Sequence, residues 1–371
     1  MKIGIDARFI GPKGTGIGTY TQNLIANLQK IDTKNQYLIF LKKENWQNVK
    51  ISSKNFDKIL ADVSWYSLEE QLKMGSIFKS SNLDLVHVPH FNVPIFYSGK
   101  FIVTIHDLIH HHFPQTVSTT KNPVIFKLKR LGYHLIFKNA LTRSKKIIVP
   151  SNFVKEDLIA NCKVNPSKIA LIYEAAEEGY LQKTHHSQLI THHNLIYVGN
   201  TYPHKNLEKL LYAFKILNTK YKILNTKLIL VSPRDVFAQR LVTEIKKRNL
   251  QDKVELLGWQ NSAALVKLFA KSTAYVSPSL SEGFGIPALN AMASNLPLIC
   301  SSIPTYREIY GEAAIYFDPN NPSDIAQKIK KVLEDSKTRS DLVKKGSVQV
   351  KKYSWLKMAK QTLEIYKSVL S

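Results

Sequence analysis

The sequence is poor in cysteine: its 371 residues include only Cys162 and Cys300, which stand far apart. Two distant cysteines suit a reducing compartment better than a disulfide framework. Long hydrophobic runs are missing as well. No stretch of 18 uncharged apolar residues occurs, so no segment is long enough to span a bilayer. The first eight residues contain Asp6 and Arg8 where an export signal needs an apolar core. We therefore expect a cytoplasmic protein.

Acidic residues are scarce, because 28 Asp and Glu stand against 52 Lys and Arg, a formal net charge of +24. Between Leu108 and Lys155 there is no Asp or Glu at all. Such a charge favours an anionic partner: nucleic acid, an anionic membrane surface or a phosphorylated substrate. No helix-turn-helix, zinc or aromatic RNA-binding signature accompanies the basic residues, so we expect no nucleic-acid partner.

The usual signatures of a metal site are also absent from the sequence. No Asp-x-Asp pair, which could hold a cation against a diphosphate, occurs anywhere. His106 and the run His110–His112 cluster in sequence, but no carboxylates or thiolates stand beside them at ligand spacing. We therefore expect no metal ion.

The length and the pattern of the chain predict two domains. An apolar fraction of 44% can fill two cores. Short apolar strands alternate with helical patterns up to Pro150 and again from Leu195 onwards, which is typical of an α/β fold with parallel sheets. We expect Rossmann-like domains at residues 1–172 and 195–355, joined by a linker at 173–194. The last helix, 356–371, has no strand after it.

The most informative run is Ser281–Ala293, a Gly-rich turn between the apolar strand Ala274–Val276 and an apolar helix. Unpaired backbone N–H groups at a helix start form a cradle for phosphate. The carboxylate of Glu282, beside that turn, can accept hydrogen bonds from sugar hydroxyls. The run therefore predicts a site for a sugar joined to a diphosphate. An ordinary strand–turn–helix connection is the alternative interpretation.

Three further segments follow predicted strands, where ligands of open α/β sheets bind. Gly14–Tyr20 is a Gly-rich loop that opens a helix; its spacing differs from a dinucleotide fingerprint, so we expect close approach to a phosphate or sugar, or a plain turn. His106 ends the strand Phe101–Ile105 and would bond a hydroxyl in the cleft, or be a surface histidine. Lys205 precedes a helix, where its charge suits a diphosphate; an exposed lysine is the alternative.

A helical pattern at Asn122–Asn139 is both apolar and basic. Its apolar stripe comprises Val124, Leu128, Leu131 and Leu135, and its basic stripe comprises Lys127, Arg130, His134 and Lys138. Such a helix could lie on an anionic membrane, with Lys127, Arg130 and Lys138 facing the headgroups. Alternatively, its basic face is solvated and its apolar stripe faces the core. The core-facing interpretation is preferred.

Together these segments resemble the retaining, nucleotide-sugar-dependent glycosyltransferases of family four, with mannosyltransferase-like features and the GT-B fold. The likeness runs over nearly the whole chain and is carried by Gly4–Arg8, Thr15–Tyr20, Thr104–Leu108, Tyr197–Asn200, Pro203–Leu207, Pro278–Pro287, Gly311–Ala314, Asp318–Pro319 and Tyr353–Trp355. It implies two Rossmann-like domains that face each other across a cleft. The first would lie on the acceptor side, completed by the last helix, and the second would bind the nucleotide sugar.

The resemblance also implies roles for matching residues. Glu282 would contact hydroxyls of the donor sugar, His106 would bind the transferred sugar, and Lys205 would neutralise the leaving phosphate. The positions implied to meet the diphosphate are Gly16, Ile17, Lys205, Phe284, Gly285 and Ile286.

Two positions depart from the family pattern. The family has a second Glu eight residues after the first, usually holding the nucleotide ribose, and here that residue is Asn290. An amide still bonds hydroxyls but loses the charge-assisted component, of order 1 kcal/mol. The Arg often found after the Gly that follows the opening strand of the second domain is Asn200.

The functional hypothesis is retaining transfer of a hexose, with GDP-mannose marginally preferred as donor, to a hydroxyl of a glycan or lipid-linked acceptor in cell-surface polysaccharide synthesis. The nucleotide sugar is the co-substrate, and no other cofactor is expected. The protein would be cytoplasmic, with peripheral attachment to the inner face of the membrane as a further expectation. A GT-B-like sugar epimerase or phosphorylase, or a catalytically weak sugar-nucleotide-binding paralogue, is the alternative.

Overall fold

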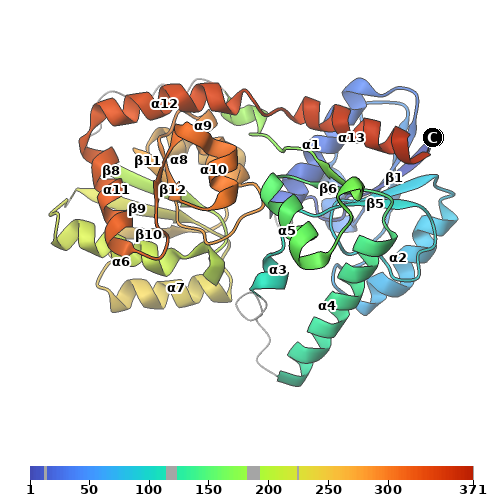
Figure 1. Cartoon of the computed structure of the whole chain (residues 1–371), viewed down its shortest axis with the longest axis horizontal. Helices are drawn as coiled ribbons and strands as arrows, with labels where there is room; N and C mark the ends of the chain where they lie inside the picture. Colours follow the sequence, from blue (N-terminus) through green and yellow to red (C-terminus); the bar gives the residue numbers. More distant parts are fainter. Residues whose placement is uncertain (12–14, 114–122, 182–192, 224, 371) are drawn as a thin grey trace. The chain divides into compact units, whose positions relative to one another are not determined.

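The computed structural model describes residues 1–371 except 12–14, 114–122, 182–192, 224 and 371. The chain divides into two compact units (Figure 1). Unit 1 comprises Met1–Leu108, Thr120–Glu174 and Ser354–Ser371, and unit 2 comprises Ile109–Thr119 and Ala175–Tyr353. The predicted linker therefore begins in unit 1, and its residues from Ala175 onwards group with unit 2. Three of its four histidines, at 185, 186 and 192, lie outside the described residues.

Unit 1 is built on a seven-stranded parallel sheet with strand order β3-β2-β1-β4-β5-β6-β7. The strands are β1 Lys2–Asp6, β2 Gln36–Leu41, β3 Phe56–Leu60, β4 Leu85–Val88, β5 Phe101–Thr104, β6 Ile147–Val149 and β7 Ile169–Leu171. The helices are α1 Thr15–Ile31, α2 Leu68–Ser80, α4 Pro123–Arg143, α5 Asn152–Cys162 and α13 Trp355–Leu370, with the 3₁₀ turns η1 Lys43–Asn48 and η2 Pro166–Lys168.

Unit 2 holds a six-stranded parallel sheet with strand order β10-β9-β8-β11-β12-β13. The strands are β8 His193–Val198, β9 Thr226–Val231, β10 Val254–Leu257, β11 Ala274–Ser277, β12 Leu298–Ser301 and β13 Ala314–Phe317. The helices are α3 Ile109–His112, α6 Leu207–Thr219, α7 Val236–Lys247, α8 Ser262–Ala270, α9 Ile286–Ala293, α10 Pro304–Tyr310, α11 Pro322–Glu334 and α12 Ser336–Val350, with η3 Glu178–Tyr180, η4 Pro203–Lys205 and η5 Gly311–Ala313. The predicted α/β fold with two parallel sheets is confirmed.

Both sheets follow the doubly wound order, in which the winding direction reverses beside the first strand of the unit. In unit 2 the reversal lies between β8 and β11, which pair through Ala274–Leu195 and Tyr275–Ile196. The loops that leave the carboxyl ends of these two strands diverge, and ligands bind in the crevice that this leaves. Lys205 follows β8 and Glu282 follows β11, so the chain order alone directs both toward one edge of the sheet.

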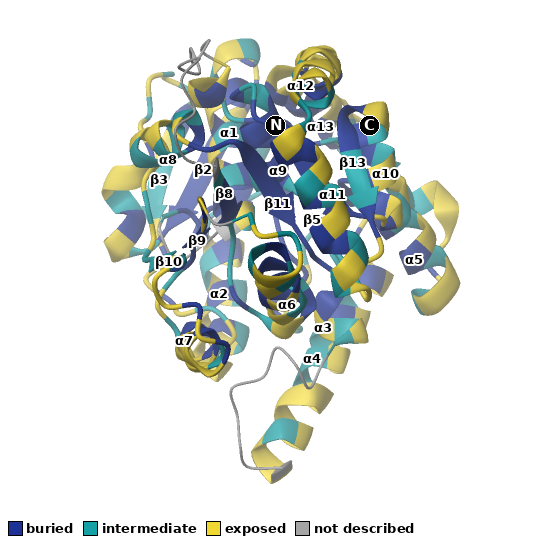
Figure 2. Cartoon of the chain, turned by 90° about the vertical axis from the view of Figure 1, so that its left-hand side faces the viewer, coloured by how far each residue is buried: buried dark blue, intermediate teal, exposed yellow. Residues whose placement is uncertain are grey.

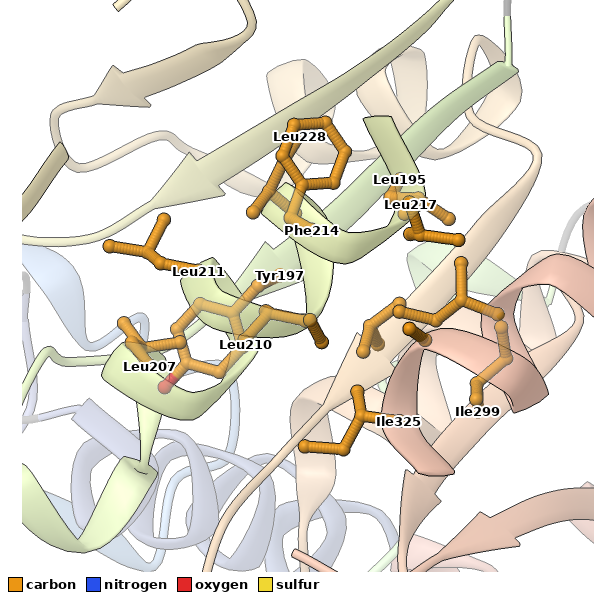
Figure 3. Close-up of a cluster of buried hydrophobic side chains, with 14 of the residues drawn as sticks. Leu195, Tyr197, Leu207, Leu210, Leu211, Phe214, Leu217, Leu228, Ile299 and Ile325 are labelled. Atoms are coloured by element: carbon orange, nitrogen blue, oxygen red, sulfur yellow. The ribbon is translucent and has the colours of Figure 1, made fainter. Parts of the chain in front are cut away.

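The core of unit 2 lies between its sheet and the helices that pack on it. The central strand β11 is a dark, buried segment in Figure 2. Figure 3 shows Leu210, Phe214 and Leu217 of α6 packed beside Leu195 and Ile299 from the sheet. These helical positions recur every three or four residues, which places them on one face of α6. Strands covered on both faces need near-continuous apolar sequence, as in β8 and β12.

In unit 1 the last helix, α13, packs against α1. A buried histidine in β4 fastens α13 to the sheet: His87 Nδ1 lies 2.7 Å from the Tyr366 hydroxyl, and Nε2 lies 2.8 Å from Thr104 Oγ1. Burial, with a smaller contribution from the nearby His106, lowers the pKa of His87 to about 3. The ring is therefore neutral at neutral pH, as its two hydroxyl partners allow.

We expect His87 to make the stability of unit 1 sensitive to mild acid. Between pH 6.5 and 5.0 the unfolded chain protonates this histidine while the folded chain does not, so unfolding becomes easier by about 2 kcal/mol. In His87→Gln the stability advantage of the wild type should shrink by that amount between pH 7.5 and 5.0. Urea unfolding followed by tryptophan fluorescence measures it, with the exposed His134→Gln as control. A pH-independent difference would contradict the prediction.

The structure corrects the preferred interpretation of the basic helix. Leu128, Leu131 and Leu135 of α4 are 64%, 58% and 54% exposed, so this apolar stripe does not face the core. Only the following turns are buried, at Phe137, Ala140 and Leu141. The reason is visible in Figures 1 and 2, where the N-terminal part of α4 extends beyond the sheet of unit 1. Lys127, Arg130 and Lys138 are exposed as well.

None of the helices in the described part of the chain combines the length and the apolar character needed to cross a membrane.

Candidate active site

Two loops at the reversal point of unit 2 bring the predicted residues Lys205 and Glu282 together. The first loop leaves β8 and ends in the short turn η4, which carries Lys205. The second leaves β11 and runs through Glu282 into α9. A backbone hydrogen bond from Leu280 N to His204 O, 2.8 Å long, ties the two loops to each other. This bond fixes the two side chains within one small site.

Glu282 is the centre of a hydrogen-bond network. Its Oε1 accepts from Lys205 Nζ at 2.7 Å and from Ser279 Oγ at 2.7 Å, with the Tyr306 hydroxyl 3.2 Å away. Its main-chain carbonyl accepts from Thr305 Oγ1 at 2.7 Å. Among the described residues, none donates to Oε2. The second carboxylate oxygen is therefore available to a hydroxyl of a ligand.

The charges of this pair are largely shielded from water, since the side chains of Lys205 and Glu282 are 13% and 15% exposed. Burial by itself would raise the pKa of the Glu282 carboxyl. The Lys205 ammonium and the hydrogen bonds from Lys205 and Ser279 outweigh it, so the pKa lies below its usual value. Glu282 is therefore an anion at neutral pH, and Lys205 is its counter-ion.

His204, the neighbour of Lys205, is a buried neutral imidazole. Burial first, and then the Lys205 charge, lower its pKa to about 3. Neither of its ring nitrogens has a hydrogen-bond partner within the described ranges. A neutral His204 adds no positive charge, so the cationic character of this loop rests on Lys205.

The turn after Glu282 has an unusual backbone conformation. Gly285 is the N-cap of α9 with φ of +96°, a conformation that side-chain-bearing residues rarely adopt. Its carbonyl accepts from the Tyr310 hydroxyl at 2.8 Å. In the described part of the chain, the N–H groups of Gly285 and Ile286 donate no hydrogen bond. Unpaired N–H groups at a helix start suit an anion. Phe284, also a predicted diphosphate contact, is buried beside them.

Asn290 lies one turn further along α9 and is 5% exposed. Its Oδ1 accepts from Glu177 N at 2.9 Å, and its Nδ2 donates to Glu177 Oε1 at 3.0 Å. Glu177 was not among the predicted site residues, because it belongs to the segment interpreted as a linker. The two residues are 113 positions apart in sequence, and no local pattern could have paired them.

The other predicted residues belong to unit 1. His106 Nδ1 lies 2.8 Å from a carboxylate oxygen of Glu174, and Nε2 lies 3.1 Å from the carbonyl of Pro89. Its ring also packs edge-on against Tyr20, with centroids 4.9 Å apart. Both ring nitrogens thus face acceptors of the protein itself. A ligand hydroxyl would have to replace one of these contacts.

The Gly-rich segment Gly14–Tyr20 of unit 1 differs from the predicted loop, because it is already helical from Thr15, where α1 begins. Gly16 and Ile17 therefore lie in the first turn of a helix and not in a loop. A Cβ at Gly16 would meet nothing within 4 Å, whereas a Cβ at Gly18 would lie 2.5 Å from the carbonyl oxygen of Phe9. Close packing therefore explains why residue 18 is a glycine, whereas a side chain at position 16 would have open space around it.

Asn200, the second residue that departs from the family pattern, makes hydrogen bonds within its own loop. Its carbonyl accepts from the Tyr197 hydroxyl at 2.7 Å, and its Oδ1 accepts from Tyr202 N at 3.3 Å.

As for metals, no group of three or more His, Cys, Asp or Glu side chains suited to an ion is found among the residues that the structure describes.

Two family models match the chain, and their matches follow the two halves. The model described as Glycosyltransferase Family 4 matches residues 15–177, and the model described as Glycosyl transferases group 1 matches residues 187–349.

Known proteins resemble the chain over most of its length. The O-antigen chain mannosyltransferase RfbU of Salmonella typhimurium is 25% identical over 334 residues, 87% of this chain and 88% of the relative. Among solved structures, sucrose-phosphate synthase from Thermosynechococcus elongatus has a TM-score of 0.80 at 19% identity, covering 100% and 99% of the two chains. HepE of Anabaena, in complex with UDP-glucose, has a TM-score of 0.74 at 14% identity, covering 99% and 100%. At these identities the structures bear on the fold alone, and they agree with the expected GT-B fold.

Proposed function

Because the chain belongs to the group 1 and family 4 glycosyltransferases, we propose that it moves a hexose, with mannose preferred, from a nucleotide diphosphate sugar to a hydroxyl of a glycan or lipid-linked acceptor, with retention of anomeric configuration. The observation that carries the proposal is the Glu282–Lys205 pair, 2.7 Å apart at the reversal point of unit 2. The relative RfbU, an O-antigen chain mannosyltransferase, supports mannose as the transferred hexose and a role in polysaccharide synthesis. In this proposal the reaction takes place on the cytoplasmic side of the membrane.

The chemistry follows from the charges of the site. As the bond from the anomeric carbon to the diphosphate breaks, negative charge grows on the leaving phosphate and positive charge grows on the sugar ring. Lys205 and the N–H groups of Gly285 and Ile286 stabilise the former. Glu282 holds sugar hydroxyls through its available Oε2. No nucleophile is assigned, so the acceptor oxygen attacks from the same face and its proton passes to the leaving phosphate.

In this proposal the residues of unit 1 serve the same reaction. His106 contacts the transferred sugar, and Gly16 and Ile17 approach the diphosphate from the start of α1. Asn290 and its surroundings receive the nucleotide ribose. The reaction needs no metal ion, because Lys205 and backbone N–H groups take the place of a cation at the diphosphate.

A donor screen tests the function. Purified protein is incubated with GDP-mannose, UDP-glucose, UDP-galactose and UDP-N-acetylhexosamines together with a lipid-linked acceptor extract, and released nucleotide is measured with and without EDTA. We expect release from one donor, dependent on acceptor and unchanged by EDTA. Conversion of the sugar without acceptor would indicate an epimerase. Binding without turnover of any donor would indicate a catalytically weak paralogue.

The exposed face of α4 supports a second partner, an anionic membrane surface. Three exposed leucines, Leu128, Leu131 and Leu135, recur at helical spacing beside the exposed Lys127 and Arg130. Apolar side chains of this kind can enter the acyl boundary while neighbouring basic groups contact anionic headgroups. Attachment through α4 would bring the enzyme to a lipid-linked acceptor.

We expect binding to vesicles to depend on both stripes of α4. Wild-type protein should sediment with phosphatidylglycerol vesicles at low salt and not with phosphatidylcholine vesicles. Replacing Leu128, Leu131 and Leu135 by Ser should weaken binding at least tenfold, since each buried Leu contributes about 1.5–3 kcal/mol. Charge reversal at Lys127, Arg130 and Lys138 should abolish it, at about 1 kcal/mol for each lost charge.

The matched control is the pair of leucines on α2, Leu68 and Leu72, which are 84% and 68% exposed. Their replacement by Ser should leave vesicle binding unchanged. Equal sedimentation of wild type and both α4 variants would show that α4 is not the attachment surface. Circular dichroism of each variant establishes that the helix content is retained.

A further inference from the structure

We propose that Glu177 supplies the carboxylate that position 290 lacks, and that it binds hydroxyls of the nucleotide ribose. This inference rests on the proposed function, because it assigns a contact to the same donor. It names a residue outside α9 for the task, on the segment that precedes the first strand of unit 2.

The side-chain amide of Asn290 is already engaged in hydrogen bonds. Its oxygen accepts the Glu177 N–H at 2.9 Å, and its nitrogen donates to Glu177 Oε1 at 3.0 Å. Asn290 is also buried. An amide has one acceptor atom, and here that atom faces the backbone of Glu177. Asn290 therefore positions Glu177 and has little capacity left to accept a hydrogen bond from a ribose hydroxyl.

The backbone around Glu177 is held firmly in place. It caps the turn η3, whose residue Tyr180 is 1% exposed, and the preceding residue Ala176 is 4% exposed. The turn packs against α8 and α9. The backbone of Glu177 is therefore fixed beside α9 by its buried neighbours, Ala176 and Tyr180, and by its two hydrogen bonds with Asn290.

The Glu177 carboxylate has acceptor capacity that the protein does not use. Asn290 is its one hydrogen-bond donor among the described residues, through Oε1, and Oε2 accepts none there. Burial raises the pKa of Glu177, although the Asn290 hydrogen bond opposes the rise. A carboxylate with unused acceptor capacity gains from new donors. The vicinal hydroxyls of a ribose are such donors, and an acidic residue in this role is familiar from other Rossmann-like sites.

The sequence difference then has a physical explanation. A Glu at 290 would place a second carboxylate against Glu177, within the reach of its present 3.0 Å hydrogen bond. Two adjacent buried carboxylates repel each other and cannot both ionise easily. An amide at 290 removes that repulsion, and it leaves one carboxylate in the site, carried by Glu177.

The test compares ribonucleotides with their deoxy forms. Binding of GDP, UDP, 2′,3′-dideoxy-GDP and 2′,3′-dideoxy-UDP to the full chain is measured by calorimetry. For wild type we expect the ribonucleotide to bind more tightly than its dideoxy form. Glu177→Gln should weaken ribonucleotide binding about ten- to hundredfold and leave the dideoxy form within about twofold, so that the discrimination disappears. The adjacent, exposed Glu178→Gln is the control and should bind like wild type.

A swap separates ribose binding from a structural role. In Glu177→Gln with Asn290→Glu the carboxylate moves to α9, and discrimination between ribose and dideoxyribose should return. Equal weakening of both nucleotide forms by Glu177→Gln would overturn the inference and leave the proposed function standing. So would a wild type that binds both forms equally. Failure of wild type to bind either GDP or UDP would overturn the proposed function together with the inference.

Discussion

Replacing Lys205 by Ala is expected to reduce turnover of the nucleotide sugar about 10²–10³-fold. A preorganised donor aimed at the charge of a transition state has this effect when it is removed. Lys205 is the ammonium of its loop, is 13% exposed, and neighbours an imidazole that is neutral. The loss should fall on kcat more than on KM, because the charge on the diphosphate is largest in the transition state.

The measurement is steady-state release of nucleotide, with Lys215→Ala as control. Lys215 is an exposed lysine of the following helix, α6, and its loss should leave turnover unchanged. A companion variant, Glu282→Gln, keeps the size of the side chain and removes its charge. It should lower turnover at least tenfold, with a larger loss for the hexose than for binding of the free nucleoside diphosphate. If Lys205→Ala and Glu282→Gln both turn over like wild type, the site lies elsewhere.

Lys205→Ala also has a consequence for stability. Glu282 would keep its buried carboxylate and its Ser279 hydrogen bond but lose its counter-ion, so its pKa should rise from its lowered value. We therefore expect the double variant, Lys205→Ala with Glu282→Gln, to unfold at higher denaturant than Lys205→Ala alone. Activity should not return with the stability, which separates the two roles of the pair.

The pairing of Lys205 with Glu282 could be anticipated from the sequence because it depends on strand order. Each residue follows an apolar strand, and parallel strands deliver their carboxyl ends to one edge of a sheet. The Gly-rich turn before α9 could also be predicted from the sequence, because Gly283 and Gly285 stand between an apolar strand and an apolar helix. Features set by the alternation of strands and helices were therefore predictable.

The two edge strands of unit 1 were not predictable in the same way. The strand β3, Phe56–Leu60, has Asp57 and Lys58 in its centre, and β7 is only three residues long. Both lie at the ends of their sheet, where one side is open and the apolar pattern is weak. Their pairing partners, rather than their own sequences, make them strands.

The environment of the apolar stripe on α4 and the contact of Glu177 could not be predicted from the sequence, for a different reason. Periodicity states which side chains share a helical face, but it does not state what lies opposite that face. The stripe around Leu131 was therefore assigned to the core although it faces solvent. In the same way, the contact of Glu177 with Asn290 joins residues that are 113 positions apart. Such facts depend on the packing of elements and appear only with the folded chain.

Replacing Gly285 by Ala is the second large effect that we expect. The φ of +96° at this position is strained for any residue with a side chain. The added Cβ would lie well inside 3.0 Å of the Tyr310 hydroxyl and 3.0 Å from Tyr306 Cε1. Both tyrosines serve the site: Tyr310 holds the Gly285 carbonyl, and the Tyr306 hydroxyl lies 3.2 Å from Glu282 Oε1. The methyl group therefore displaces the supports of the carboxylate.

We expect Gly285→Ala to destabilise the chain by about 2–4 kcal/mol, the sum of backbone strain and overpacking, and to lower turnover at least a hundredfold. Urea unfolding and nucleotide release measure the two effects. Adding Tyr310→Phe removes the clashing oxygen, so the double variant should recover part of the stability while the strain of the positive φ remains. Gly132→Ala is the matched control, because a Cβ there meets nothing within 4 Å and Ala favours its helix. Wild-type stability and turnover in Gly285→Ala would mean that the turn accepts a side chain, and the main-chain cradle for the diphosphate would then lose its structural basis.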